Sequence, residues 1–321
     1  MKRQLMLTTA IASASVLLVS MAAPAATAAS ADPVLAALKS IPASAGLFTG
    51  NLGISSTSKP SARLPLASIP EDPSLGLRVV SATGSKLTVG LPRADEAGDA
   101  TELQPGIVAY DNGDGSHTVP IAKIDGSVQV ATVLESSAAP DRYSYEVGGA
   151  ATLQADGDII VVRDNQGQFA GAIAPAWAMD AAGTAVPTHY EASGSTVTQV
   201  VDHANGSYTY PIVADPWLGQ DLFNKMTTSS DRGQPRYLVF RSGWGAAMST
   251  STSAVPVFLG PGWDEAKNKW PVLLSKTSLH EQYDCHSIYA LLKPDSWNLE
   301  KWRPNKSDWG ASALAHQCNW G

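Results

Sequence analysis

The chain has 321 residues, of which 44% are hydrophobic and only 16% charged, and its formal net charge at pH 7 is −7. This length favours more than one domain, and the low charged fraction with abundant Gly, Ser, Thr and Ala favours β-structure rich in turns over a helical bundle. Residues 30–216 carry 9 Lys and Arg against 20 Asp and Glu, whereas residues 217–321 carry 11 against 9. The acidic part argues against nucleic acid as a partner, and the change in balance predicts a domain boundary near residue 216.

Residues 1–29 have the pattern of a secretory signal peptide. Lys2 and Arg3 precede an apolar run over 5–19, and Ala26 and Ala28 offer an Ala-x-Ala cleavage site. A membrane anchor would need about 20 strongly apolar residues. We therefore expect a secreted protein that is not inserted in a membrane after signal cleavage.

Residues 30–76 mix Ser, Ala and Pro without a sustained period. Only the stretch 33–38 has the composition for one or two helical turns. The segment reads as a leader or linker of low order.

Residues 77–216 alternate between apolar and polar side chains, which is typical of strands with one buried face. Asn-Gly and Asp-Gly pairs recur between the alternating runs, many about ten residues apart, as in an antiparallel sandwich or barrel built from hairpins. We predict an acidic, sandwich-like antiparallel β module. The strand centres expected are 87–91, 119–121, 128–134, 143–147, 159–161 and 208–212.

The end of this module also carries a resemblance. The run Tyr210-Pro211-Ile212-Val213-Ala214-Asp215-Pro216, together with 175–180, 186–190 and 198–203, resembles a β-rich module of secreted actinobacterial proteins. In that group a Tyr-Pro-x-x-x-Asp-Pro run closes the β module before a different C-terminal domain. The resemblance implies architecture and no activity.

Residues 217–321 change character, and eight of the nine tryptophans lie here. The run 236–241 predicts one strand, and 263–274 has apolar residues at helical spacing. The run 279–292 is either a helix throughout or a helix that leads into a strand at 288–292. We predict a small α+β domain.

The two cysteines, Cys285 and Cys318, are the only ones in the chain. In an exported protein such a pair indicates one disulfide, which would stabilise the fold by roughly 3–4 kcal/mol. A zinc site built with His286 and His316 is the alternative, although adjacent ligands rarely reach one ion. A nucleophilic Cys285 paired with His316 is a further one. We predict no metal and no cofactor.

Catalytic motifs give little support to an enzyme, since Gly-x-Ser-x-Gly, His-Glu-x-x-His and phosphate-binding glycine patterns are absent from the sequence. The richest cluster of chemistry is the run 297–304. Its tryptophans are either core anchors beside a local ion pair or walls of a groove that binds glycans or peptides. The candidate ligand-binding residues are His286, Trp297, Asn298, Glu300, Trp302 and Arg303.

The same stretch carries a second resemblance. Gln282-Tyr283-Asp284-Cys285-His286, the Trp-Asn-Leu-Glu-x-Trp-Arg-Pro run at 297–304 and the terminal Cys318-Asn319 resemble a domain of unknown function at the C-terminus of secreted actinobacterial proteins. That resemblance covers residues 217–321 and implies no activity.

Three functions stay open at this point. The first is binding of a cell-envelope or extracellular ligand, a glycan or a peptide. The second is a secreted enzyme or effector toxin in which His286 is the general acid or base, Glu300 orients it and Arg303 stabilises an anion. The third is a structural extracellular protein. The lack of a complete catalytic set favours the first.

Overall fold

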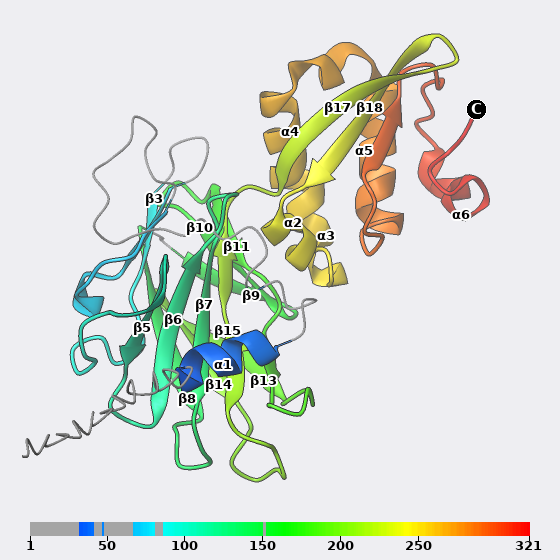
Figure 1. Ribbon diagram of the computed structural model, residues 1–321. Coiled ribbons are helices and arrows are strands. Elements are labelled where there is room, and N and C mark those ends of the chain that lie inside the picture. Colours follow the sequence, from blue (N-terminus) through cyan, green and yellow to red (C-terminus); the bar gives the residue numbers. More distant parts are fainter. Residues whose placement is uncertain (1–31, 42–46, 48–66, 81–85, 150–151) are drawn as a thin grey trace, which may run out of the picture. The chain divides into compact units, whose positions relative to one another are not determined.

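A computed structural model describes most of the chain after the predicted signal peptide (Figure 1). The signal peptide at 1–29 and most of the predicted leader lie outside the described residues. The described residues are 32–41, 47, 67–80, 86–149 and 152–321.

Two antiparallel sheets form the N-terminal part and confirm the predicted β-rich fold. The smaller sheet has the order β1 (Ala67–Ser68), β2 (Leu77–Val80), β3 (Lys86–Val89), β8 (Arg142–Gly148), β14 (Thr196–Val201), β13 (Thr188–Ser193). The larger has the order β4 (Thr101–Gln104), β5 (Ile107–Asp111), β6 (Ser116–Ala122), β7 (Val128–Leu134), β16 (Trp217–Gly219), β11 (Phe169–Ile173), β10 (Ile159–Arg163), β9 (Thr152–Asp156). In addition, β15 (Ile212–Asp215) pairs with β7, and β12 (Trp177–Met179) pairs with β15.

The core of this part lies between the two sheets. Strand β8 alternates buried and exposed residues, and Tyr143 and Tyr145 point inward from it. They join one apolar cluster with residues of the larger sheet such as Val130 and Ile212. The apolar residues of the alternating pattern therefore lie on the inner face of a sandwich.

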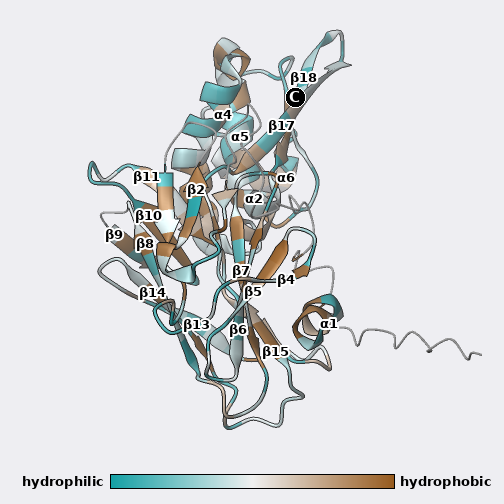
Figure 2. Ribbon diagram, turned by 60° about the vertical axis from the view of Figure 1, so that its left-hand side comes forward, coloured by the Kyte–Doolittle hydropathy of each residue, from teal (hydrophilic) through white to brown (hydrophobic). Residues whose placement is uncertain are grey.

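Strand β7 is buried along its whole length, which alternation alone does not explain. Its second face is covered by helix α1 (Pro33–Ser40), whose Leu38 packs with Val133 in a separate apolar cluster. The Asp32 carboxylate caps this helix by accepting from the backbone N–H groups of Val34 and Leu35 at 2.9 and 3.2 Å. Figure 2 shows the neighbouring strand β15 as mostly hydrophobic.

The C-terminal part combines helices with a small sheet, as predicted. The sheet has the order β17 (Phe223–Asp231), β18 (Gln234–Arg241), β19 (Trp297–Glu300). The helices are α2 (Gly243–Met248), α3 (Val255–Val257), α4 (Trp263–Lys269), α5 (Thr277–Tyr289) and α6 (Ala313–His316). A π-helical turn spans Phe258–Gly262, and 3₁₀ turns span Pro73–Leu75, Thr252–Ala254, Pro271–Ser275 and Trp309–Ser312.

Several predicted boundaries differ from the structure. The helix expected over 263–274 ends at Lys269, because Pro271 restricts the preceding residue and a 3₁₀ turn follows. Helix α5 runs to Tyr289, and no described strand occupies 288–292. The strand expected over 208–212 instead begins at Ile212. Among the described residues, no helix is both long enough and apolar enough to cross a membrane.

Candidate functional site

His286 lies on α5 and is partly buried, with its ring nitrogen Nε2 engaged in a hydrogen bond to the backbone. Its Nε2 donates to the backbone carbonyl of Asn298 at 3.2 Å, and its ring lies parallel to that of Trp297 with 6.0 Å between centroids. Burial lowers the pKa of His286 from 6.5 to about 4, although the hydrogen bond to Asn298 raises it. The imidazole is therefore neutral at pH 7, and these contacts give no support to a general acid.

Trp297 on β19 is a core residue. Its side chain is only 2% exposed, and its ring meets those of Phe223, Phe258 and Tyr283 at centroid distances between 5.4 and 5.6 Å. Edge and tilted contacts of this kind are typical of packed aromatic clusters. Of the two interpretations of this tryptophan, the structure favours the core anchor over the groove wall.

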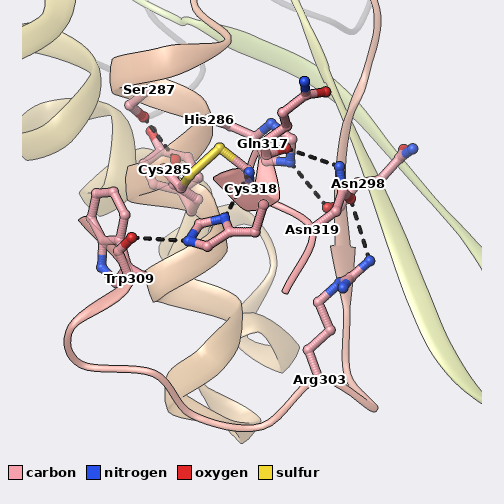
Figure 3. Close-up of a disulfide and its surroundings, with 11 residues drawn as sticks. Cys285, His286, Ser287, Asn298, Arg303, Trp309, Gln317, Cys318 and Asn319 are labelled. Atoms are coloured by element: carbon pink, nitrogen blue, oxygen red, sulfur yellow. Dashed lines mark hydrogen bonds between the residues drawn. A yellow bond between two sulfur atoms is a disulfide. The ribbon is translucent and has the colours of Figure 1, made fainter. Parts of the chain in front are cut away.

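Glu300 and Arg303 form a buried ion pair in which Arg303 Nε donates to Glu300 Oε2. The same guanidinium donates to the carbonyl of Trp320 and, at 3.3 Å, to Asn319 Oδ1 (Figure 3). The pair thus ties the end of β19 to the last residues of the chain. A buried pair with its remaining donors satisfied is costly to break, because removing one partner leaves a charge without compensation.

Trp302 and Asn298 are partly exposed. The indole Nε1 of Trp302 donates to Asp231 Oδ2 at 2.7 Å, and the guanidinium carbons of Arg232 and Arg303 lie 3.7 and 4.4 Å from its ring centroid. The contacts with Asp231 and Arg232 hold the tip of the β17–β18 hairpin against the segment that follows β19. The residues proposed from the sequence are therefore close together, and most of them serve packing.

The predicted disulfide is confirmed, since Cys285 and Cys318 are bonded with 5.5 Å between their Cα atoms. Both sulfurs are used in this bond, so neither is available as a zinc ligand or a nucleophile. His316 links the disulfide to the preceding turn. Its Nε2 donates to the carbonyl of Trp309 at 2.9 Å, and its Nδ1 accepts from the backbone N–H of Cys318 at 3.1 Å.

An aromatic pair beside the disulfide was missed from the sequence. Tyr289 is 46% exposed and follows Cys285 by one helical turn. Its ring meets that of Trp309 edge to face, at 6.4 Å and 87°. Trp309 packs in turn against the buried cluster that contains both cysteines. The position of Trp309 between the two cysteines could have pointed to this residue. The exposure of Tyr289 could not be predicted, because it depends on where α5 ends.

The comparisons with known proteins bear on this C-terminal part alone. Residues 225–321 match a family described as a protein of unknown function, DUF2599. This confirms the resemblance drawn from the cysteines and the tryptophan run. No curated protein matches the chain.

Proposed function

Starting from a C-terminal region that belongs to the DUF2599 family, we propose that this protein is exported and binds a cell-envelope or extracellular glycan through that region. The binding surface is the pair Tyr289 and Trp309 with the apolar residues next to it. The observation that carries the proposal is this aromatic pair, in which Tyr289 is exposed and Trp309 partly buried, held on a disulfide-linked scaffold.

The scaffold favours binding because it fixes the pair in advance. The disulfide joins α5 to the C-terminal tail, and His316 fixes the backbone at Trp309. Tyr289 is the last residue of α5, so its backbone is held by the helix. A rigid surface loses little conformational entropy when a ligand binds, and more of the contact energy then appears as affinity.

The chemistry of the surface suits a sugar. Flat aromatic faces pack against the C–H faces of sugar rings, while nearby polar groups bond the hydroxyls. Lys306 and Asp308 stand just before Trp309 in the chain and pair with each other at 3.1 Å. Leu292, which follows Tyr289 in the chain, is 62% exposed and adds apolar area.

Two features support export. Residues 1–29 carry the pattern of a signal peptide, and disulfides persist in oxidising compartments outside the cytoplasm. The low pKa of His286 and the buried pair of Glu300 and Arg303 give the enzyme alternative no comparable support.

The test compares Tyr289→Ala with Leu274→Ala, which removes an apolar side chain that is more exposed (63% against 46%) from a different segment. Co-sedimentation with purified bacterial cell-wall polysaccharide measures binding, and titration with soluble oligosaccharides follows tryptophan fluorescence. We expect Tyr289→Ala to weaken binding at least tenfold and Leu274→Ala to leave it unchanged. Equal binding by both variants would refute this surface, and binding of short peptides without any binding of sugars would refute the glycan.

A further inference from the structure

The two edges of the small C-terminal sheet differ in how their backbone groups are bonded. Strand β19 lies at one edge, and side chains of α5 bond its outward backbone groups. His286 donates to the carbonyl of Asn298 at 3.2 Å. The side-chain amide of Gln282 accepts from the N–H of Glu300 at 2.8 Å and donates to its carbonyl at 3.1 Å. This edge is therefore closed to a further strand.

Strand β17 lies at the other edge, and side chains close only its beginning. Glu265 accepts from the N–H of Phe223 at 2.9 Å, and Lys269 donates to the carbonyl of Phe223 at 2.6 Å. Thr228 and Ser230, further along the strand, are exposed. Figure 1 shows the far end of the β17–β18 hairpin extending past the helices.

The register of this hairpin shows which backbone groups of β17 face outward. In an antiparallel ladder, hydrogen-bonded pairs alternate with pairs whose backbone groups point away from each other. The carbonyl of Pro235 accepts from the N–H of Lys301 on the β19 side at 2.9 Å, so the opposite residue, Ser230, points its backbone groups away from β18. The same holds at every second residue, for Thr228 and Met226. Among the described residues, these outward N–H and carbonyl groups have no hydrogen-bond partner.

We propose that β17 pairs with β17 of a second copy of this chain, antiparallel and about a two-fold axis at Thr228. An open strand edge is a template for a further strand, and a two-fold interface joins the same surface of both copies. On this axis Thr228 lies opposite its own counterpart and Met226 lies opposite Ser230, so every outward residue joins a hydrogen-bonded pair. A shift by two residues in either direction leaves one of them without a counterpart. The backbone therefore selects one register.

The charges of β17 agree with this register. Lys225 and Asp231 are equally far from Thr228 in the sequence, so Lys225 of each copy lies opposite Asp231 of the other. Opposite charges directly across two strands favour pairing, and like charges oppose it. Among the described residues neither forms an ion pair, since Lys225 Nζ lies 5.4 Å from the ring centroid of Phe240 and Asp231 accepts from Trp302. The pairing goes beyond the proposed glycan binding and uses none of the residues of that surface.

Sedimentation velocity of the intact mature protein, at concentrations from micromolar to millimolar, measures the self-association. We expect a reversible equilibrium between monomer and dimer. Thr228→Pro removes the central outward N–H and no hydrogen bond to β18, and proline is tolerated in edge strands, so we expect at least tenfold weaker association. Thr228→Ala keeps the N–H and is the matched control. Equal association of these two variants would overturn the proposal, and so would a natural protein that stays monomeric, whether or not its edge binds an added extended peptide.

Exchange of the charges tests the register. Lys225→Glu and Asp231→Lys each place like charges opposite one another in their own dimers, and each alone should associate at least tenfold more weakly. In an equal mixture of the two variants every carboxylate again faces an ammonium, so association should return. Circular dichroism checks that both variants fold, because Asp231→Lys also removes the hydrogen bond to Trp302. Folded variants that associate no better together than alone would contradict this register.

Discussion

Acidification from pH 7 to pH 5 acts in opposite directions on two groups whose pKa values are shifted by desolvation, His286 and Asp215. Burial lowers the pKa of His286 from 6.5 to about 4 and raises that of Asp215 from 3.8 to about 7. In the unfolded chain both groups return to their ordinary pKa values. The folded and unfolded states therefore bind different numbers of protons between these limits, and the free energy of unfolding depends on pH.

Acidification changes the free energy of unfolding in opposite directions through the two groups. For His286 the unfolded chain takes up a proton below pH 6.5 while the folded protein does not, so stability falls as the pH decreases toward 4. Linkage gives a loss of about 2 kcal/mol between pH 7 and pH 5. For Asp215 the folded protein takes up the proton first, and the same acidification stabilises it by about 2 kcal/mol.

The two contributions nearly cancel in the natural protein, and single substitutions separate them. Upon acidification to pH 5, His286→Gln should gain about 2 kcal/mol relative to the natural protein, and Asp215→Asn should lose about 2 kcal/mol. Gln keeps a donor for the Asn298 carbonyl, and Asn keeps an acceptor for Gln129. The other carboxylates contribute equally to all three proteins, because the effects of distant sites add.

Urea denaturation at pH 5, 6 and 7, followed by tryptophan fluorescence, measures the three unfolding free energies. The differences between variant and natural protein at each pH are the quantities to compare. If both variants follow the pH dependence of the natural protein, His286 and Asp215 titrate in the folded state as they do in the unfolded chain. The burial-driven pKa shifts would then be refuted.

Three further substitutions test the packing of the C-terminal part. Replacing Cys285 and Cys318 together by Ser should lower the free energy of unfolding by about 3–4 kcal/mol, because the disulfide closes a loop with a sequence separation of 33. Denaturant unfolding measures this loss, and a loss under about 1 kcal/mol would contradict the predicted stabilisation. Glu265→Gln should lower the free energy of unfolding, measured by chemical denaturation, by about 1–3 kcal/mol. The reason is that the carboxylate accepts from two buried backbone N–H groups at 2.7 and 2.9 Å. An unchanged denaturation midpoint would show that these hydrogen bonds do not stabilise the fold. Gly245→Ala should lower the melting temperature, because the added Cβ would lie 2.1 Å from a backbone oxygen, whereas Gly98→Ala meets nothing within 4 Å and should not. Equal melting temperatures for the two alanine variants would contradict the close approach at Gly245.

The strands of the sandwich could be predicted where one face is buried. In β8 the inward Tyr143 and Tyr145 alternate with exposed residues, and the sequence shows the same period of two. Strand β7 is buried on both faces. The sequence indicated helical turns at 33–38, but it did not indicate that this helix covers the second face of β7. The predicted domain boundary near residue 216 stays a prediction, and β16 continues the larger sheet from Trp217 to Gly219.

The candidate site was predicted only in part. The disulfide could be predicted from the cysteine count and the expected compartment, because two cysteines in a chain predicted to be exported usually pair with each other. The sequence did not predict which tryptophans are buried in the core and which are partly exposed. Trp297 and Trp309 belong to the same Trp-rich stretch, but one is enclosed by Phe223, Phe258 and Tyr283 and the other reaches an exposed face.

The sequence by itself determined the β-rich N-terminal part, the disulfide and the family of the C-terminal part. These depend on local periodicity, on turn residues and on a long motif, all of which are written in neighbouring positions. Only the tertiary structure decided which side chains are enclosed. It buried Trp297, left Tyr289 exposed and placed Asp215 beside a pocket lined by two indoles. Enclosure depends on elements far apart in the chain, so no local pattern records it.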